Sequence, residues 1–354
     1  MRVRVHDLHG DIVVLAAGAV KSGTPCGVPR ALDARPRDEY SSAMRVHLIH
    51  NPVAGPRDVA DDLVEVVAYL ESQGWELTQR TTLGPGDATT FAREAVARGA
   101  DMVVAVGGDG TLSEVVNGLA GTNAVLGFLP VGTGNVWAHM VGIPVWGTKG
   151  RQALLDAARI LVEGRVRRVD LGKARDRYFA LWLGMGFDAQ VAGDIEPHRE
   201  LRRSMGNVAY LVTALALCLV FRGTRLTVVV DGRVLRQRAV MVVISNAQLY
   251  GPTWRLAPRA RLDDGLLDVY IFRGASTLDV LRYTALLFAG QHMRDPKLEV
   301  LQGRRLEIRG SRPLPFHLDG DPAGYTPVRI EVAPKALRVM LPAHVPEGLL
   351  GEDA

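Results

Sequence analysis

Cysteine and long apolar runs are both scarce in this chain of 354 residues. Its two cysteines, Cys26 and Cys218, have no metal-ligand spacing and no second pair, so a reduced compartment is expected. No stretch reaches the roughly 18 apolar residues of a membrane-spanning helix. The longest uncharged run, residues 208–221, predicts a buried or interfacial helix. Residues 11–20 are apolar but precede no convincing cleavage site, so no signal peptide is predicted.

Lysine is also scarce, because only five of the 42 basic side chains are lysines and the others are arginines. The formal net charge is +4. An arginine-rich balance suits anionic partners such as phosphates, nucleotides or acidic lipid headgroups, and composition does not choose among them. The length and the 47% of hydrophobic residues predict two globular domains with sizeable cores.

Residues 1–43 are predicted to be a flexible N-terminal extension, because residues 22–42 have the composition of a linker. Met44 is therefore expected to lie near the functional start. Beyond it, strand patterns alternate with helical spacing, which predicts βαβ units and a parallel sheet over residues 44–168. The predicted strands are residues 46–50, 76–81, 102–106 and 125–129, and the predicted helices are residues 58–72, 88–98 and 112–119.

A second, β-rich domain is predicted over residues 169–327, because strand patterns follow one another there with few helices between them. Residues 328–354 could belong to either domain. The predicted strands are residues 166–171, 178–183, 226–230, 239–245, 267–272, 306–309, 314–318, 328–332 and 337–341, and the predicted helices are residues 206–221 and 278–288.

The most informative segment is residues 103–112, in which a buried strand runs into Gly107-Gly108-Asp109-Gly110-Thr111 and then a helix. Glycines let backbone N–H groups converge on a phosphate. Thr111 is predicted to cap the helix, whose N-terminus favours anions. Asp109 would repel a triphosphate by about 4 kcal/mol at ~4 Å and an effective dielectric of about 20. Asp109 is therefore predicted to handle Mg²⁺, directly or through water; the alternative is a glycine-rich turn without a ligand.

Two further loops have the same character. Residues 129–135, Leu-Pro-Val-Gly-Thr-Gly-Asn, follow the next strand, and residues 51–55, Asn-Pro-Val-Ala-Gly, follow the first. In an open α/β sheet, loops at the carboxyl ends of neighbouring strands form one ligand crevice. A GxxxxGK[ST] sequence and a complete GxGxxG sequence are both missing, which excludes a P-loop kinase and an ordinary dinucleotide dehydrogenase.

The three loops resemble the three signatures of the diacylglycerol kinase catalytic domain family, which includes bacterial lipid kinases and sphingosine kinases. The Gly-Gly-Asp-Gly-Thr element is shared with NAD kinases, whereas the other two loops point to the lipid kinases. The resemblance covers residues 44–342. It implies an α/β plus β-rich fold, with an N-terminal Rossmann-like three-layer α/β domain (NAD kinase/phosphofructokinase-like) and a C-terminal antiparallel β-sandwich domain.

By this resemblance, the nucleotide contacts fall on the loops and on one further strand end, at Thr82. The alternative for Thr82 is a strand-end residue before a helix cap, without a nucleotide contact. The implied nucleotide-binding residues are Asn51, Thr82, Gly107, Gly108, Asp109, Gly110, Thr111, Leu112, Ser113, Gly132, Thr133 and Asn135.

In the second domain, residues 179–189 and 250–268 resemble further family segments. The resemblance implies that Asp264 holds a Mg²⁺ together with the backbone carbonyls of Arg261 and Leu266. Hard oxygen ligands on a turn are what this ion prefers. An Asp-Gly hairpin turn without a metal is the alternative.

The family's general base is the glutamate of an Asp-Gly-Glu motif, and Asp321 occupies its place in the segment at residues 317–321. The implied catalytic residues are thus Asp321 and Asp109. Aspartate is one methylene shorter than glutamate, so a closer backbone, a relay water or another carboxylate would be needed. A turn with solvated carboxylates is the alternative.

The resemblance implies an ATP- and Mg²⁺-dependent kinase that phosphorylates a hydroxyl of a membrane lipid, with diacylglycerol as the preferred candidate. Such an enzyme is expected to be cytoplasmic, to contact the anionic inner membrane surface transiently and to bind no nucleic acid; a homodimer is left open. Arg199, Arg202 and Arg203 are predicted to dock on anionic lipid, or else to form a solvated face beside a core helix. An NAD kinase-like enzyme and a non-catalytic nucleotide or lipid sensor are the alternatives.

Overall fold

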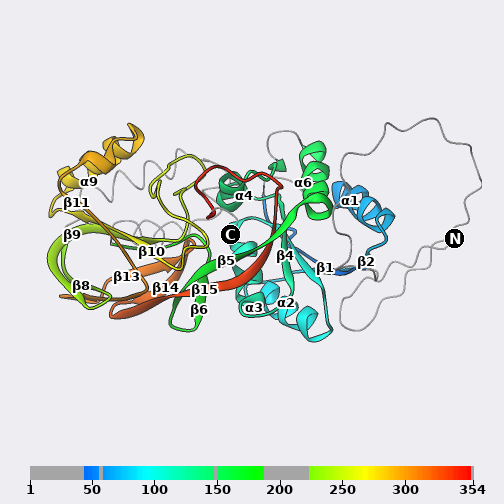
Figure 1. Ribbon diagram of the computed structural model, residues 1–354, viewed down its shortest axis with the longest axis horizontal. Helices are drawn as coiled ribbons and strands as arrows, with labels where there is room; N and C mark the ends of the chain where they lie inside the picture. Colours follow the sequence, from blue (N-terminus) through cyan, green and yellow to red (C-terminus); the bar gives the residue numbers. More distant parts are fainter. Residues whose placement is uncertain (1–43, 56–58, 147–149, 187–222, 352–354) are drawn as a thin grey trace, which may run out of the picture.

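The computed structural model describes residues 44–55, 59–146, 150–186 and 223–351, which form two lobes along the long axis of the molecule (Figure 1). The predicted N-terminal extension and the predicted docking patch at residues 199–221 lie outside these ranges. In the described part of the chain, no helix combines the length and the apolar character needed to cross a bilayer.

The first lobe is a parallel sheet packed with helices. Its strands lie in the order β2-β1-β3-β4, and each neighbouring pair is parallel. Every residue of β3 and β4 is buried, as expected for central strands of a parallel sheet covered on both faces. Its elements are β1 (Arg45–His50), α1 (Ala60–Ser72), β2 (Glu76–Thr81), α2 (Asp87–Ala97), β3 (Met102–Gly107), α3 (Asp109–Leu119), β4 (Val125–Pro130), α4 (Val136–Val141) and α6 (Arg151–Glu163).

Two features of this lobe follow directly from the sequence pattern. Helix α1 buries Leu63, Val66, Val67 and Leu70, which recur at helical spacing and form one apolar stripe. Strand β1 lies between β2 and β3, so the strand order reverses at β1. In open α/β sheets, the crevice at such a switch point is where ligands bind.

The second lobe is built from antiparallel strands around its own apolar core, to which Phe179, Leu183, Val228 and Ile271 belong. The predicted fold class, a parallel α/β domain and a β-sandwich-like domain, is confirmed. The elements are β5 (Arg165–Ala174), β6 (Arg177–Phe179), β7 (Trp182–Gly186), β8 (Thr224–Val230), β9 (Arg233–Ser245), β10 (Leu267–Arg273), α9 (Thr277–Phe288), η2 (His292–Arg294), β11 (Leu298–Gly303), β12 (Arg305–Gly310), β13 (Pro315–Leu318), β14 (Asp321–Tyr325) and β15 (Val328–Leu341).

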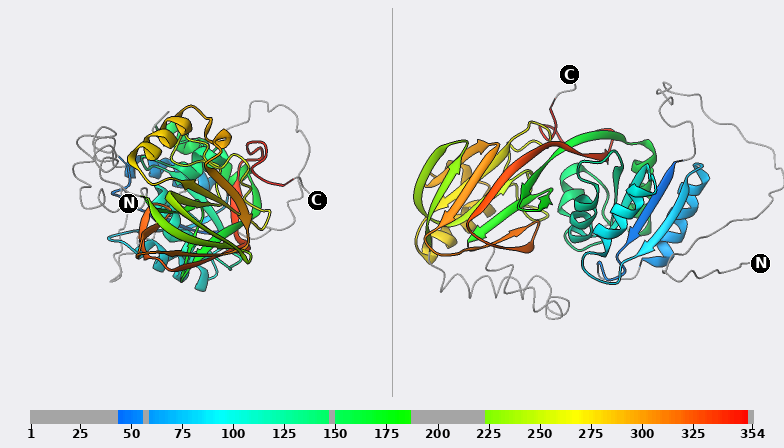
Figure 2. Two further views of the ribbon diagram at one scale, coloured as in Figure 1. Left: turned by 90° about the vertical axis from the view of Figure 1, so that its left-hand side faces the viewer. Right: turned by 90° about the horizontal axis from the view of Figure 1, so that it is seen from below.

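A ribbon of β5 and β15 joins the two lobes (Figures 1 and 2). The first half of β15 pairs with β12, and near its end Arg338 and Val339 pair in parallel with β4. The two strands predicted at residues 328–332 and 337–341 are therefore one continuous strand, whose register shifts between Ala333 and Leu337. This strand contributes to both lobes.

Several predicted elements differ from the observed ones. Helices α4 and α6 and strands β11 and β14 have no predicted counterpart. The single strand predicted at residues 178–183 is two strands, β6 and β7, interrupted at residues 180–181. The helix predicted to start at Leu112 starts at Asp109, so Gly110 lies within its first turn.

Candidate functional site

The loops that follow the parallel strands leave the sheet at one edge. Strand β1 ends in register with β2 and β3, and β3 ends in register with β4. The Asn51 N–H donates to the Val106 carbonyl at 3.0 Å, and the Thr82 N–H donates to the His50 carbonyl at 2.9 Å. These bonds continue the sheet pairing beyond the strand ends, so Asn51 lies beside the glycine loop after β3, and Thr82 lies one strand further away, beside the end of β1.

A side-chain hydrogen bond joins the loop after β1 to helix α3. Asn51 Nδ2 donates to Thr111 Oγ1 at 3.0 Å, and Asn51 Oδ1 accepts the Val53 N–H at 3.2 Å. The prediction that Thr111 caps α3 is wrong, because Gly108 is the N-cap and Thr111 is the third helical residue. A Cβ on Gly107 would lie 2.4 Å from Thr111 Oγ1, so the Thr111 hydroxyl occupies the space that a side chain at residue 107 would need, and residue 107 must be glycine.

The three loops are packed backbone against backbone. A Cβ on Gly132 would lie 2.4 Å from Gly108 Cα and 2.9 Å from Asn135 Oδ1. A Cβ on Gly55, which has a φ of +83°, would lie 2.0 Å from the Val131 carbonyl oxygen. Glycine is therefore required at these contacts, and the three predicted loops form one continuous backbone surface.

The Asp109 side chain joins the loop after β3 to the segment that follows the loop after β4. Its Oδ2 accepts the Val136 N–H at 2.9 Å, and its Oδ1 accepts the Trp137 N–H at 3.2 Å. Amides in the first turn of a helix have no partner within the helix, so a carboxylate at the start of α4 is favourable. Burial raises the pKa of Asp109, while these N–H bonds and nearby His139 oppose the rise. Its contact with Mg²⁺ stays a prediction.

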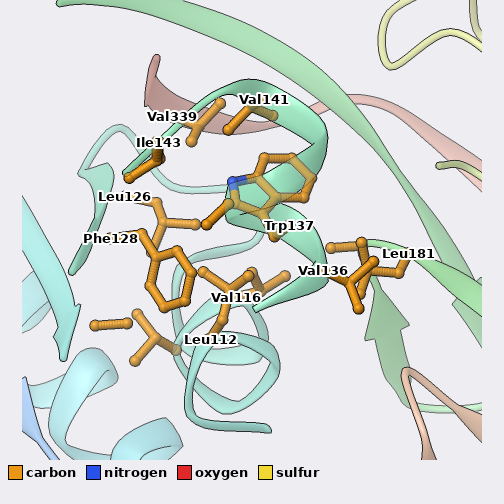
Figure 3. Packing of buried hydrophobic residues seen from close by; sticks show 14 of the residues in the cluster. Leu112, Val116, Leu126, Phe128, Val136, Trp137, Val141, Ile143, Leu181 and Val339 are labelled. Atoms are coloured by element: carbon orange, nitrogen blue, oxygen red, sulfur yellow. The ribbon is translucent and has the colours of Figure 1, made fainter. Parts of the chain in front are cut away.

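An apolar core lies directly behind the loops (Figure 3). Leu112 lies beside Phe128 and Val116, and Val136 is directed towards Leu181 of the β6–β7 connection. Leu112 is 1% exposed. Its side chain therefore belongs to the core, and only its backbone faces the loop.

Two polar atoms at the loops are buried and have no hydrogen-bond partner among the described residues, namely Ser113 Oγ and Asn135 Oδ1. The Asn135 side chain is turned inward because its Nδ2 donates to the Gly132 carbonyl at 2.7 Å. An unpartnered buried polar atom costs about 1–3 kcal/mol. A ligand that hydrogen-bonds to these atoms would recover that cost. Of the remaining predicted residues, Thr133 and Gly110 are exposed at the loop surface.

The predicted base, Asp321, is the first residue of β14 on the β13–β14 hairpin. Its side chain is 39% exposed, and its Oδ2 lies 3.5 Å from Arg177 Nη2. Arg177 begins β6, the short strand that also contacts α3. Asp321 is thus a solvent-accessible carboxylate held beside a cation.

Two hydrogen bonds connect β6, which carries the partner of Asp321, to helix α3, which follows the glycine loop. Asn117 Nδ2 donates to the Tyr178 carbonyl, and Asn117 Oδ1 accepts the Tyr178 N–H, both at 2.9 Å. We call this pair of bonds the Asn117 bridge. Asn117 lies about 12 Å along α3 from Asp109, at 1.5 Å per residue. Since Tyr178 directly follows Arg177, α3 and the Asp321 carboxylate are attached to the same short strand.

Asp319 anchors the same hairpin from the other side. Its carboxylate accepts the Ala180 N–H at 2.9 Å and the Leu181 and Trp182 N–H groups at 2.9 and 3.0 Å. These three amides lie where the strand predicted at residues 178–183 is interrupted. Burial raises the pKa of Asp319 to about 6 against the opposing effect of the three N–H bonds, and the charge of Asp321 adds to the rise.

Asp319 should make the stability of the protein depend on pH. Its folded pKa of about 6 lies above the ordinary value of 3.8, so the folded state binds this proton more tightly than the unfolded state. The stabilisation is fully present below about pH 4 and is lost as pH rises towards about 6, at roughly 1.4 kcal/mol per pH unit. Urea unfolding of the wild type and Asp319→Asn from pH 4 to 7 should show the difference in unfolding free energy falling across this window. A difference that is constant with pH would contradict the raised pKa.

Asp264 lies on a turn where several carboxylates gather. Buried Asp170 accepts the Gly265 and Lys335 N–H groups, both at 2.6 Å, and so fixes the turn against β15. Burial raises the pKa of Asp264, and the charges of Asp170 and Asp263 raise it further. Negative charge therefore accumulates around this turn.

The suitability of this turn for Mg²⁺ rests on its donor atoms. Asp264 Oδ1 accepts the Leu266 N–H at 3.0 Å, which places the carboxylate against the backbone of its own turn. Within the described ranges, no three His, Cys, Asp or Glu side chains are arranged to hold a metal ion. One carboxylate with the carbonyls of Arg261 and Leu266 nevertheless fits a hard cation that keeps several waters. The predicted ligand set thus remains a prediction.

The chain was compared with known proteins. A family model described as the diacylglycerol kinase catalytic domain matches residues 45–174, and one described as the YegS C-terminal NAD kinase beta sandwich-like domain matches residues 182–341. The chain therefore combines a domain of the diacylglycerol kinase catalytic domain family with a YegS C-terminal domain. The resemblance inferred from the three loops is therefore confirmed, and kinases of this family use ATP.

Named relatives of this family member are similar over nearly their whole length. A diacylglycerol kinase of Bacillus subtilis (strain 168) is 29% identical over 307 residues, covering 86% of this chain and 99% of the relative. A diacylglycerol kinase of Staphylococcus aureus (strain bovine RF122 / ET3-1) is 28% identical over 312 residues, or 87% and 96% of the two chains. A crystal structure of a diacylglycerol kinase from Bacillus anthracis str. Sterne has 24% identity and a TM-score of 0.68, covering 84% and 96%, which shows a shared fold.

Sequence reasoning gave no role to Asn117, Arg177, Asp319 and Asp170. Their partners are distant in sequence: 61 residues separate Asn117 from Tyr178, and 139 separate Asp319 from Ala180. One usable signal was present for Asn117. It is a polar residue within the otherwise apolar run of residues 115–120, and a polar group that is buried in such a run requires a partner.

Proposed function

We propose that this family member is an ATP-dependent lipid kinase that transfers the γ-phosphoryl group to a hydroxyl of a membrane lipid, with diacylglycerol as the preferred acceptor. The observation that carries the proposal is the packing of three glycine loops at one sheet edge, with helix α3 joined through the Asn117 bridge to β6, whose Arg177 pairs with Asp321. The relatives named diacylglycerol kinases support the class of acceptor.

The loops would bind the triphosphate mainly through backbone N–H groups. Glycine at residues 107, 108 and 132 leaves the backbone accessible, and the start of α3 adds a favourable end for an anion. The Ser113 hydroxyl, which lacks a partner among the described residues, would donate to a phosphate oxygen, and the Asn135 Oδ1 would accept from a hydroxyl or amino group of the nucleotide. Mg²⁺ at the phosphates would neutralise their charge, and a second one held by Asp264, Arg261 and Leu266 would fix the turn.

Asp321 would accept the proton of the acceptor hydroxyl. Phosphoryl transfer depends mostly on positioning and charge neutralisation, and a base positioned within hydrogen-bond reach adds to both. The Asn117 bridge fixes Tyr178 of β6, and Asp319 fixes the residues that follow β6. Strand β6 also carries Arg177, the partner of Asp321. The substrate lipid would require contact with an anionic membrane surface, and the cytoplasmic location follows as part of the same proposal.

The test is a transfer assay with γ-labelled ATP and Mg²⁺ over diacylglycerol, a sphingoid base, ceramide and NAD, with separation of the products. Labelled phosphatidate from diacylglycerol is the expected result. Labelled NADP would instead identify an NAD kinase-like enzyme. No transfer to any acceptor, with ATP still bound, would identify a non-catalytic sensor.

Asn117→Ala is expected to lower kcat by roughly 10- to 100-fold, because misplacement of reacting groups by about 1 Å has effects of that size. KM for ATP should change much less, because Asn51 and Asp109 still join the glycine loops. Asn123→Ala, at an exposed asparagine in the loop before β4, is the matched control. Steady-state kinetics with both variants checks this, and equal changes in kcat and KM for Asn117→Ala would contradict a positioning role.

A further inference from the structure

Helix α9 exposes an apolar stripe to solvent. Leu278 is 75% exposed, Leu281 41% and Phe288 63%, and Ala285 between them is exposed as well. These residues recur at spacings of three and four, so they lie along one side of the helix. Only Val280 and Tyr283 of α9 are buried against the lobe. A surface helix normally turns polar residues outward, and α9 does the opposite.

An aromatic pair extends this stripe beyond the helix. The ring of Trp254 packs edge-on against Phe288, with centroids 4.9 Å apart and planes at 69°. Trp254 lies on the turn closed by the Tyr250–Trp254 bridge. We call Trp254, Leu278, Leu281, Ala285 and Phe288 together the α9 face. Helix α9 lies at the outer end of the second lobe, away from the first (Figure 1).

The acidic side chains near the α9 face are engaged in local contacts, which leaves arginines as the exposed charges. Residues 273–297 contain two acids, Asp279 and Asp295. Asp279 accepts the Ala275 and Ser276 N–H groups in a capping box, and these bonds lower its pKa to about 2. The Asp295 side chain is fully buried and paired with Arg282.

Arginines are left at the rim of this surface. Arg255 follows Trp254, and Arg294 lies in η2 after the helix; both are exposed. Arg273 at the end of β10 binds the carbonyls of Pro296 and Lys297 rather than an acid. The α9 face is therefore an apolar and aromatic strip bordered by positive charge.

We propose that the α9 face is the surface through which the protein docks on an anionic lipid bilayer. Leucine and phenylalanine on one helix face, an interfacial tryptophan and flanking arginines are the features by which a helix lies in the headgroup region. Arginines near an anionic leaflet add attraction that salt weakens. The inference rests on the proposed function, which requires the enzyme to reach a lipid.

A second copy of the chain fits this surface less well. In a two-fold contact the same patch meets itself. The rim arginines would then face their own copies without exposed acids from residues 273–297 to balance them. A bilayer of anionic lipid supplies the missing negative charge.

The test is co-sedimentation of the full chain with phosphatidylcholine vesicles, with and without 30% phosphatidylglycerol, in the absence of ATP. Wild-type protein should bind the anionic vesicles, and added salt should weaken the binding. Leu278→Asp and Phe288→Asp should each reduce the bound fraction at least about tenfold, because a charge enters the apolar strip. Val64→Asp, at a 66% exposed valine on α1, is the matched control and should bind like the wild type.

Three results would overturn the proposal. Unchanged vesicle binding by both α9 variants would show that another surface docks. A fall of several degrees in their thermal midpoints, with none for Val64→Asp, would show that the α9 face is covered in the free protein. A lower mass of the variants in sedimentation equilibrium would show a contact between copies.

A second assay distinguishes a failure of the docking proposal from a failure of the proposed kinase function. Phosphorylation of a short-chain, water-soluble diacylglycerol needs no bilayer, so both α9 variants should keep wild-type turnover in that assay. If the wild type binds vesicles through α9 but phosphorylates none of the acceptors, docking stands and the proposed function fails. If the wild type phosphorylates the soluble acceptor and both α9 variants still bind vesicles, the proposed function stands and the docking proposal fails.

Discussion

Asp321→Asn is expected to reduce kcat by roughly 10²- to 10⁴-fold, the usual contribution of a general base. Asparagine keeps the size of the side chain but cannot take the hydroxyl proton. The fold should survive, because the side chain is 39% exposed on the first residue of β14. Steady-state transfer of labelled phosphate to diacylglycerol measures the effect, and the thermal midpoint verifies the fold.

The controls for Asp321 come from the same region. Asp176→Asn changes an exposed aspartate in the β5–β6 turn, next to Arg177, and should leave kcat unchanged. Asp321→Glu restores the longer side chain of the family motif and should retain turnover. If Asp321→Asn keeps turnover within a few-fold of the wild type, another group accepts the proton and the role assigned to Asp321 is wrong.

Gly132→Ala is expected to weaken ATP binding by roughly 100-fold, or about 2.7 kcal/mol. The added methyl group would lie 2.4 Å from Gly108 Cα and 2.9 Å from Asn135 Oδ1, so the second and third loops must separate. Gly108 Cα is a backbone atom, and the Asn135 side chain is held by its hydrogen bond to the Gly132 carbonyl, so neither neighbour moves aside freely. Calorimetric titration with ATP and Mg²⁺ measures the affinity.

The matched control is Gly84→Ala, because a Cβ at that glycine meets nothing within 4 Å. It should bind ATP like the wild type. Gly132→Ala should also unfold at a lower temperature, because overpacking typically costs 1–3 kcal/mol. Wild-type ATP affinity in Gly132→Ala would show that the contact between the two loops does not shape the nucleotide site.

The sequence predicted the features that depend on local pattern. Strands β1, β3 and β4 and the glycine loops after them follow from apolar runs that end in Gly, Asn and Pro, and the parallel order then brings the loops to one edge. The start of α3 was misplaced because Gly110 reads as a helix breaker. Gly108 has extended backbone and Asp109 opens the helix, which tolerates glycine in its first turn.

The contacts that fix the site are long-range, and no local pattern encodes them. Asp109 binds amides at residues 136 and 137, which was not deducible because α4 itself is only six residues long and has little periodicity. The break between β6 and β7 arises because Asp319 takes three N–H groups that a continuous strand would have used. Tertiary hydrogen bonding overrode the strand propensity of residues 178–183.

The glycine loops are expected to bind a triphosphate that faces the Asp321 hairpin. A crystal structure of the protein with a non-hydrolysable ATP analogue and Mg²⁺ would show this binding. We expect phosphate oxygens on the backbone N–H groups of residues 107–111 and 132–135, with the terminal phosphate on the Asp321 side of α3. A nucleotide bound elsewhere, or a terminal phosphate directed away from β13 and β14, would contradict it.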